Sequence, residues 1–132
     1  MYLLDTDICS YAMRRGNPLT VERLRQHAVG ELKISVVTHF ELEYGARRAP
    51  KGSPLMAVVE SFLANVEILP FDFSAARQAA IVRAKLAASG CLIGQFDMLI
   101  AGHTLSLGAT LVTNNVDEFS RVDGLLLENW AA

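Results

Sequence analysis

Short apolar runs alternate with longer helical patterns along this chain of 132 residues. Alternation of this kind predicts a parallel sheet, because each crossover helix must pack back onto a face of the strands that it joins. We therefore expect an α/β fold with a central, mainly parallel sheet of about four to five strands and helices on both faces. The expected strands are Tyr2–Leu4, Lys33–Val37, Glu67–Leu69 and Ala109–Val112, with Leu125–Leu127 as an edge strand.

Helical patterns fill the segments between these runs. Gly16-Asn17-Pro18 ends the first helix, because proline disfavours helical geometry in the residue before it. No linker, repeat or low-complexity segment interrupts the pattern, so we expect a single domain over residues 1–132. The expected helices lie at about 6–15, from 20 onward, and at 38–48, 55–64, 74–89 and 96–107.

Composition indicates a protein that binds a partner. Hydrophobic residues make up 52% of the chain, and its mean hydropathy is +0.28. A small domain this apolar is expected to keep apolar surface for a partner, although an alanine-rich helical core would give a similar composition. The net charge is −2, so any contact with nucleic acid must come from local clusters. The candidates are Arg14, Arg15, Arg47 and Arg48.

The sequence favours a cytoplasmic protein with no membrane contact. Cys9 and Cys91 show neither a ligand spacing nor a disulfide framework, which is typical of free thiols in a reducing compartment. Asp5 and Asp7 interrupt the N-terminus where a signal peptide would be apolar. The uncharged stretch 98–116 is broken by glycine and asparagine, and it is better explained by a helix, a stop and a strand.

Acidic or amide side chains follow four of the apolar runs: Asp5, Glu41, Asp97 and the pair Asn114-Asn115. Ligands of open α/β sheets bind at the carboxyl ends of the strands, so these side chains are expected to meet. Carboxylates gathered there repel one another. A hard cation such as Mg²⁺ removes the repulsion, since it prefers one or two carboxylates together with water and phosphate oxygens. The pattern predicts metal-assisted phosphate chemistry.

Each of these side chains also has a purely structural explanation. Asp5 precedes a helix and could cap it, although Asp7 is better placed for that role. Glu41 is the last residue of Thr38-x-x-Glu41, which has the form of a capping box, so spacing leaves cap and ligand equally open. Asp97 near a helix start is favoured by the helix dipole, and the asparagine pair is typical of turns.

The ordered set of motifs resembles the PIN-domain ribonucleases, and within them the VapC-type toxins of bacterial toxin–antitoxin pairs. No single segment is decisive, but together they span nearly the whole chain. The matching segments are Tyr2-Leu3-Leu4-Asp5-Thr6-Asp7-Ile8, Ile34-Ser35-Val36-Val37-Thr38 with Glu41-Leu42-Glu43-Tyr44-Gly45, residues 93–103 around Gly94-Gln95-Phe96-Asp97, residues 111–119 around Thr113-Asn114-Asn115, and Glu128-Asn129-Trp130.

The resemblance implies a PIN-like three-layer fold and an endoribonuclease. Asp5, Glu41 and Asp97 carry over as catalytic residues, with Mg²⁺ or Mn²⁺ held by Asp5 and Asp97 and with Glu41 acting through water. The fourth acidic position of many PIN domains falls at Asn115, where an amide departs from the fullest pattern. The expected supporting residues are Thr6, Thr113 and Asn114, and the basic residues above are the expected RNA contacts.

The resemblance also implies a substrate and partners. Metal-activated water would attack an RNA phosphodiester and leave a 5′-phosphate and a 3′-hydroxyl. The substrate class is structured RNA cut in a single-stranded loop, with a tRNA anticodon loop as the leading expectation. Cleavage would inhibit translation and growth. A cognate VapB-type antitoxin and a homodimer are the expected protein partners.

Two other functions fit parts of the sequence. Asp5-Thr6-Asp7 after a strand also resembles a haloacid-dehalogenase-type phosphatase with Asp5 as nucleophile. That family needs a catalytic lysine and a late acidic pair, whereas this chain has only Lys33, Lys51 and Lys85, and its late motif is an amide pair. In a catalytically silent binding module, the acids would merely cap helices. Metal-dependent RNA cleavage distinguishes the nuclease from both.

Overall fold

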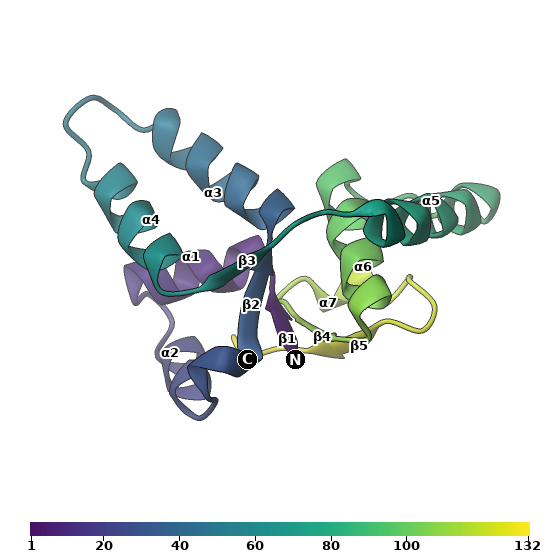
Figure 1. The fold of residues 1–132 in the computed structure, drawn as a ribbon, viewed down its shortest axis with the longest axis horizontal. Helices are drawn as coiled ribbons and strands as arrows, with labels where there is room; N and C mark the ends of the chain where they lie inside the picture. The colour runs from purple at the N-terminus through teal and green to yellow at the C-terminus, as the bar shows by residue number, and fades with distance from the viewer.

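A five-stranded parallel sheet forms the centre of the molecule (Figure 1). The computed structural model describes residues 1–132. The strand order is β3-β2-β1-β4-β5, and Tyr2 of β1 pairs with both Leu32 and Thr110. The predicted parallel sheet and its edge strand are thereby confirmed. The strands are β1 (Tyr2–Leu4), β2 (Leu32–Ser35), β3 (Glu67–Leu69), β4 (Thr110–Val112) and β5 (Leu126–Glu128).

The strand order places a topological switch point between β1 and β4. From β1 the chain builds outward through β2 and β3, and it then returns to the other side of β1 for β4 and β5. Crossovers on the two sides of such a point diverge, which opens a crevice at the carboxyl ends of the two strands. The residues that follow β1 and β4 are Asp5 and Thr113.

Helices cover both faces of the sheet, as predicted. Leu3 points into one core with α5 and α6, while Leu4 points into the other with α1, α3 and α4. Figure 1 shows α3 with α4 and α5 with α6 as two separate arms. The helices are α1 (Thr6–Arg14), α2 (Pro18–Arg25), α3 (Val36–Arg47), α4 (Leu55–Ala64), α5 (Phe73–Ala88), α6 (Gln95–Leu107) and α7 (Val116–Phe119), with a 3₁₀ turn at Val29–Glu31.

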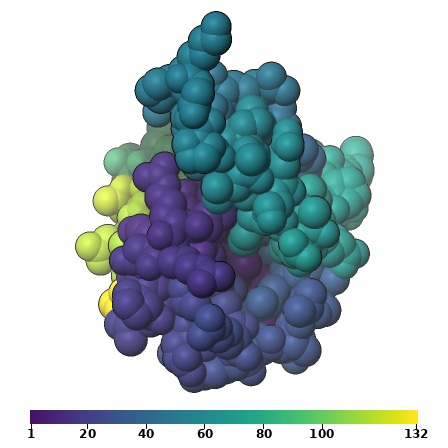
Figure 2. Space-filling view, turned by 90° about the vertical axis from the view of Figure 1, so that its left-hand side faces the viewer, coloured from purple at the N-terminus to yellow at the C-terminus, as the bar shows by residue number.

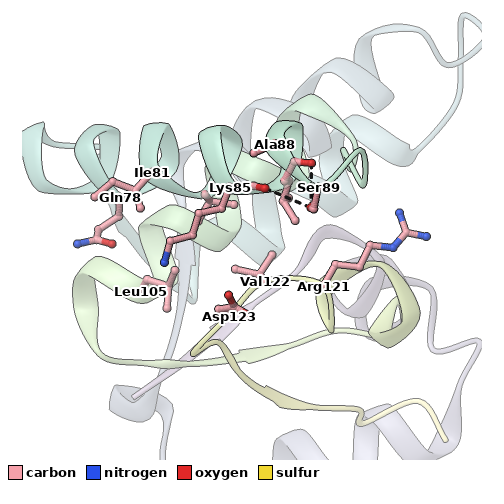
Figure 3. Close-up of a pocket in the computed structure, with 11 residues that line it drawn as sticks. Gln78, Ile81, Lys85, Ala88, Ser89, Leu105, Arg121, Val122 and Asp123 are labelled. Atoms are coloured by element: carbon pink, nitrogen blue, oxygen red, sulfur yellow. Dashed lines mark hydrogen bonds between the residues drawn. The ribbon is translucent and has the colours of Figure 1, made fainter.

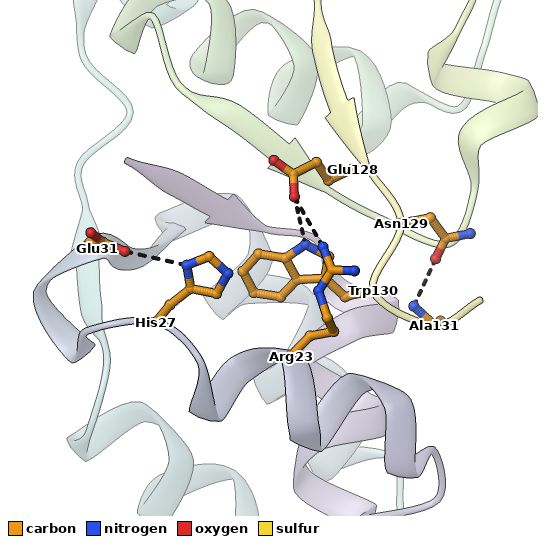
Figure 4. A network of polar contacts seen from close by, with 7 residues as sticks. All are labelled: Arg23, His27, Glu31, Glu128, Asn129, Trp130 and Ala131. Carbon is orange, nitrogen blue, oxygen red and sulfur yellow. Dashed lines mark hydrogen bonds and ion pairs between the residues drawn. The ribbon is translucent and has the colours of Figure 1, made fainter.

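The N-terminal helices and the chain end close one side of the molecule. On the face seen in Figure 2, α1 packs against α2 and α4. Trp130 is fully buried, stacks on His27 at 4.6 Å between ring centroids, and donates from Nε1 to Glu128 at 3.0 Å (Figure 4). Arg23 lies 5.7 Å from the centre of the indole. These contacts fix α2 to β5. No helix is both long and apolar enough to span a bilayer.

The start of α3 differs from the prediction. Strand β2 ends at Ser35 rather than Val37, and the Ser35 hydroxyl caps α3 by accepting from the Val37 amide at 3.0 Å. Thr38 therefore lies inside the helix, where its hydroxyl is buried without a hydrogen-bond partner. The predicted capping box is wrong, because Ser35 already occupies the N-cap position. Glu41 is thus released from a capping role.

Candidate active site

Asp5 lies at the switch point and is held by donors on both sides. It is the N-cap residue of α1, and its side chain is 5% exposed. Oδ1 accepts from the Thr6 amide at 2.8 Å, and Oδ2 accepts from the Thr113 hydroxyl at 2.7 Å. Asp7, the cap expected from position, lies instead in the first turn and accepts from the Asn114 amide at 3.1 Å. Asp5 therefore caps the helix and lines the crevice at the same time.

Glu41 reaches the same edge from α3. The Thr6 hydroxyl donates to Glu41 Oε1 at 2.7 Å, so the first residue of α1 connects Glu41 to Asp5. The Glu41 side chain is half-buried. A single residue, Thr6, thus binds one acid through its amide and another through its hydroxyl. The two threonines expected to support the site therefore both contact its acids: Thr6 binds Asp5 and Glu41, and Thr113 binds Asp5.

Asp97, in the first turn of α6, lies against an acid that sequence reasoning missed. Glu118 on α7 accepts from the Gly94 amide at 2.7 Å and shares a hydrogen bond with Asp97. A Cβ at Gly94 would lie 3.0 Å from Asp97 Oδ2 and 3.5 Å from Glu118 Oε1, so glycine leaves room for both carboxylates. The signal for Glu118 was its position in the first turn after Asn115, at the same sheet edge.

The asparagine pair after β4 contacts other members of the site rather than Asp5. The side-chain amide of Asn115 donates to Glu118, and its backbone amide donates to the Thr113 hydroxyl at 3.0 Å. Asn114 is exposed and binds Asp7 through its backbone. Asn115 therefore positions Glu118. Glu118 supplies a fourth carboxylate at this edge, although the position expected to carry the fourth acid is the amide Asn115.

The four acids influence one another electrostatically. Burial raises the pKa of Asp5 from its ordinary 3.8 to about 7, with repulsion from Asp7 and Glu41 adding to the effect. Burial, the hydrogen bond to Glu118 and repulsion from Asp5, Glu118 and Glu41 together raise the pKa of Asp97 to about 8. Burial alone would raise the pKa of Glu118, but the Gly94 amide, Asn115 and Asp97 outweigh burial and lower it. In the absence of a cation, this edge therefore retains protons.

The donor set fits a hard divalent cation. No three histidine, cysteine, aspartate or glutamate side chains form a ready-made metal cage. Mg²⁺ is seldom bound in such a cage, since it keeps several waters and takes one or two carboxylates together with phosphate oxygens. Repulsion from Asp5 contributes to the raised pKa of Asp97, and a cation bound by both carboxylates would offset this repulsion.

The candidate RNA contacts separate into two groups. Arg14 and Arg48 line one hollow between α1 and the end of α3, and Arg48 lies 5.5 Å from the centre of the Tyr44 ring. Arg47 instead forms an ion pair with Glu43 at 3.0 Å. Arg15 ends α1 in a left-handed conformation. Only Arg14 and Arg48 are brought together.

A hollow beside α5 lies away from the acids. It encloses about 610 Å³ between α5, α6 and residues 121–123, with Lys85, Leu105 and Val122 among its lining (Figure 3). None of the four carboxylates lines it. The acids instead lie at the carboxyl ends of the strands, where Glu41, Asp97 and Glu118 are half-buried and keep part of their surface exposed.

Comparison with known proteins assigns the family. Residues 2–125 match the PIN domain model. The chain is 39% identical over 130 residues to the tRNA(fMet)-specific endonuclease VapC of Shigella flexneri, covering 98% of each. It superposes with a TM-score of 0.90 on a chain of VapBC2 from Rickettsia felis bound to a promoter DNA fragment, at 35% identity and 98% coverage of both. For DNA-bound VapBC from Salmonella typhimurium, the TM-score is 0.91 at 36% identity, covering 98% and 97%.

The chain belongs to the PIN-domain family. Its relatives within that family are the VapC ribonucleases of toxin–antitoxin pairs. The resemblance drawn from the motifs is confirmed, together with the three-layer fold. The family assignment argues against the phosphatase alternative.

Proposed function

We propose that this chain is a metal-dependent endoribonuclease toxin that cleaves structured RNA and is neutralised by a VapB-type antitoxin. The observation that carries the proposal is the gathering of Asp5, Glu41 and Asp97 at the switch point of a PIN fold, where Thr6 binds both Asp5 and Glu41. When ionised, an acidic edge of this kind repels RNA, so bound protons or a cation must neutralise it, and a cation serves this purpose at any pH. In a binding module without catalytic activity, the same acids would lower the stability of the fold without serving a function, because burial and mutual repulsion disfavour their charged form.

The proposed chemistry divides among these residues. Asp5 and Asp97 would hold Mg²⁺ or Mn²⁺, which when bound activates a water and offsets charge on the phosphate oxygens. Thr113 and the Thr6 amide orient the Asp5 carboxylate. The Thr6 hydroxyl occupies one oxygen of Glu41, which leaves the other to orient a water. Glu118 shares a hydrogen bond with Asp97 and would orient that carboxylate toward a bound cation.

The proposed substrate is a tRNA, cut in its anticodon loop. The Shigella relative is named for tRNA(fMet), and its sequence aligns with 98% of this chain. Loop nucleotides are accessible to an open sheet edge, whereas paired bases are not. Attack by water would leave a 5′-phosphate and a 3′-hydroxyl. Loss of tRNA would inhibit translation in the cytoplasm and arrest growth.

The proposed partners are an antitoxin and a second copy of the chain. The Rickettsia and Salmonella neighbours are VapBC assemblies. Large apolar side chains remain exposed here, among them Val29 at 73%, Phe73 at 77% and Leu126 at 61%. Such surface favours a protein partner. An antitoxin arginine could also pair bidentately with a half-buried carboxylate of the site, such as that of Asp97.

Cleavage of a tRNA(fMet) transcript by the purified protein tests the proposal. Wild type should cut it in Mg²⁺ and not in EDTA. The Asp97→Asn variant should be slower by about a hundredfold or more. Asp117→Asn is the matched control, since this acid is exposed, precedes Glu118 in the sequence and takes no part in the hydrogen bonds of Asp5, Glu41 or Glu118. Equal rates for wild type and Asp97→Asn would contradict the assignment.

A further inference from the structure

Three aromatic side chains form an exposed row beside the acids. Phe96, Phe40 and Tyr44 are 41%, 53% and 57% exposed. The ring centroids of Phe40 and Phe96 are 5.3 Å apart, and those of Phe40 and Tyr44 are 6.4 Å apart with planes 8° from parallel. Rings held in such mutual contact keep fixed orientations while their outer faces stay accessible to a ligand.

The aromatic row begins at the acids and ends at a cation. Tyr44 lies one turn after Glu41 on α3, where residues three apart are neighbours, and Phe96 lies in the first turn of α6 with Asp97, so the row lies on the two helices that supply these acids. One turn beyond Tyr44, the Arg48 guanidinium lies over the Tyr44 ring. Arg48 shares its hollow with Arg14. An extended ligand leaving the acids along α3 would therefore meet aromatic faces first and positive charge next.

We propose that the aromatic row stacks unpaired bases of the RNA substrate next to the bond that is cut, and that Arg48 binds a phosphate beyond them. This inference rests on the proposed function and specifies how its substrate is held. Every base offers a π face, so aromatic platforms followed by arginine bind single strands with little dependence on sequence. Whatever strand reaches Asp5 and Asp97 must pass over neighbouring surface, and on the α3 side that surface is this row.

The charge on the row favours RNA over a protein as its occupant. Arg48 and Arg14 complement phosphates, whereas Arg47 is already neutralised by Glu43. The row also starts at the acids themselves, where a substrate has to bind and where a protein partner is not required for chemistry. A protein interface is the competing outcome, and the experiment separates the two.

Fluorescence of a Tyr44→Trp variant tests stacking directly. In EDTA, a ten-nucleotide single-stranded RNA with the anticodon-loop sequence of tRNA(fMet) should quench this variant more strongly than wild type, whose only tryptophan is buried. Phe73→Trp is the matched control. Phe73 is also exposed and also carries an arginine over its ring, Arg77 at 5.5 Å, but it lies on α5, which supplies none of the acids. It should show no added quenching.

Kinetics of alanine variants test the contribution to the reaction. Phe40→Ala and Phe96→Ala should each raise KM for tRNA(fMet) about tenfold, because stacking is lost from bound substrate and transition state alike. Phe40→Tyr should restore KM, and Phe73→Ala should leave it unchanged. The circular dichroism spectrum of each variant checks that the fold is intact.

The outcomes that overturn the inference are distinct from those that overturn the function. Wild-type KM in Phe40→Ala together with unquenched Tyr44→Trp would refute stacking while cleavage remained. If Phe40→Ala changed the mass of the oligomer in solution and left RNA binding unchanged, the row would be a protein interface. That result would also refute stacking. Quenching of Tyr44→Trp by RNA that wild type never cleaves would support stacking and sink the proposed nuclease instead.

Discussion

Asp5 and Glu41 of the candidate site are each held by a hydroxyl donor that belongs to another part of the chain. Thr113, after β4, holds Asp5, and Thr6 on α1 holds Glu41. Side chains locked by such contacts keep their geometry without a ligand, which is what a metal site needs in order to bind without reorganisation. Substitutions here should therefore affect chemistry more than folding.

Glu41→Gln separates a catalytic from a structural role. Glutamine keeps an oxygen for the Thr6 hydroxyl, so the free energy of unfolding should change by less than about 0.5 kcal/mol. Loss of the charge should slow cleavage by about tenfold to a hundredfold. Thermal melts and initial rates on the same preparation measure both. Normal activity with a lowered melting temperature would show that Glu41 is structural.

Metal-free stability should fall as pH rises. In the unfolded chain, Asp5 and Asp97 lose their protons near the ordinary pKa of 3.8. In the folded chain, their pKa values are about 7 and about 8, so they keep the protons to higher pH. Over that interval the folded state binds more protons, so stability is lost with increasing pH. Melts in EDTA at about pH 6.5 and about pH 8.5 avoid most of the opposing titration of buried His103, whose pKa is lowered by burial.

Mg²⁺ should then raise the melting temperature more at the higher pH, where fewer protons compete for the carboxylates. The Asp5→Asn variant should show a flatter pH dependence in EDTA. A wild-type melting temperature that rises between the two pH values in EDTA would contradict the proposed proton retention.

At the scale of elements, the α5–α6 pair carries the Asp97 side of the site. Gly102 allows the two helices to approach closely, since an added Cβ would lie 2.4 Å from the backbone of Ala79. The Gly102→Ala variant should lose about 1–3 kcal/mol of stability through overpacking. Gly45→Ala is the matched control, because that helical glycine has no atom within 4 Å of an added Cβ.

The control should gain about 0.5–1 kcal/mol from the lower conformational entropy of the unfolded chain. Chemical denaturation of the two variants measures the difference. Equal stability of Gly102→Ala and wild type would mean that the helices separate at little cost.

Most helices and strands could be predicted from the sequence, because the spacing of apolar residues and the residues that end helices are local signals. It failed at the start of α3, where Thr38-x-x-Glu41 matches a capping box but Ser35 provides the cap. Local spacing cannot tell which of two nearby hydroxyls a helix uses. It also missed Glu118, because the contact with Asp97 joins residues 21 positions apart through the Gly94 turn. Only the fold brings those two carboxylates together.

At the scale of the whole molecule, we expect toxicity and antitoxin binding to be separable. Expression of the wild-type chain alone should arrest bacterial growth, and co-expression of its antitoxin should relieve the arrest. The Asp97→Ala variant should be harmless alone yet still be retained by the antitoxin, since exposed apolar side chains provide most of the expected interface. Growth curves and a pull-down check both halves. If Asp97→Ala were as toxic as wild type, growth arrest would not depend on the acidic site.

Titration of Mn²⁺ into the metal-free protein by calorimetry tests the central claim, that the acids at the switch point form one metal site. Wild type should bind saturably, and Asp117→Asn should match it. Asp5→Asn should remain folded and bind at least about tenfold more weakly, because it loses a charged ligand. Identical Mn²⁺ affinity in wild type and folded Asp5→Asn would contradict the claim.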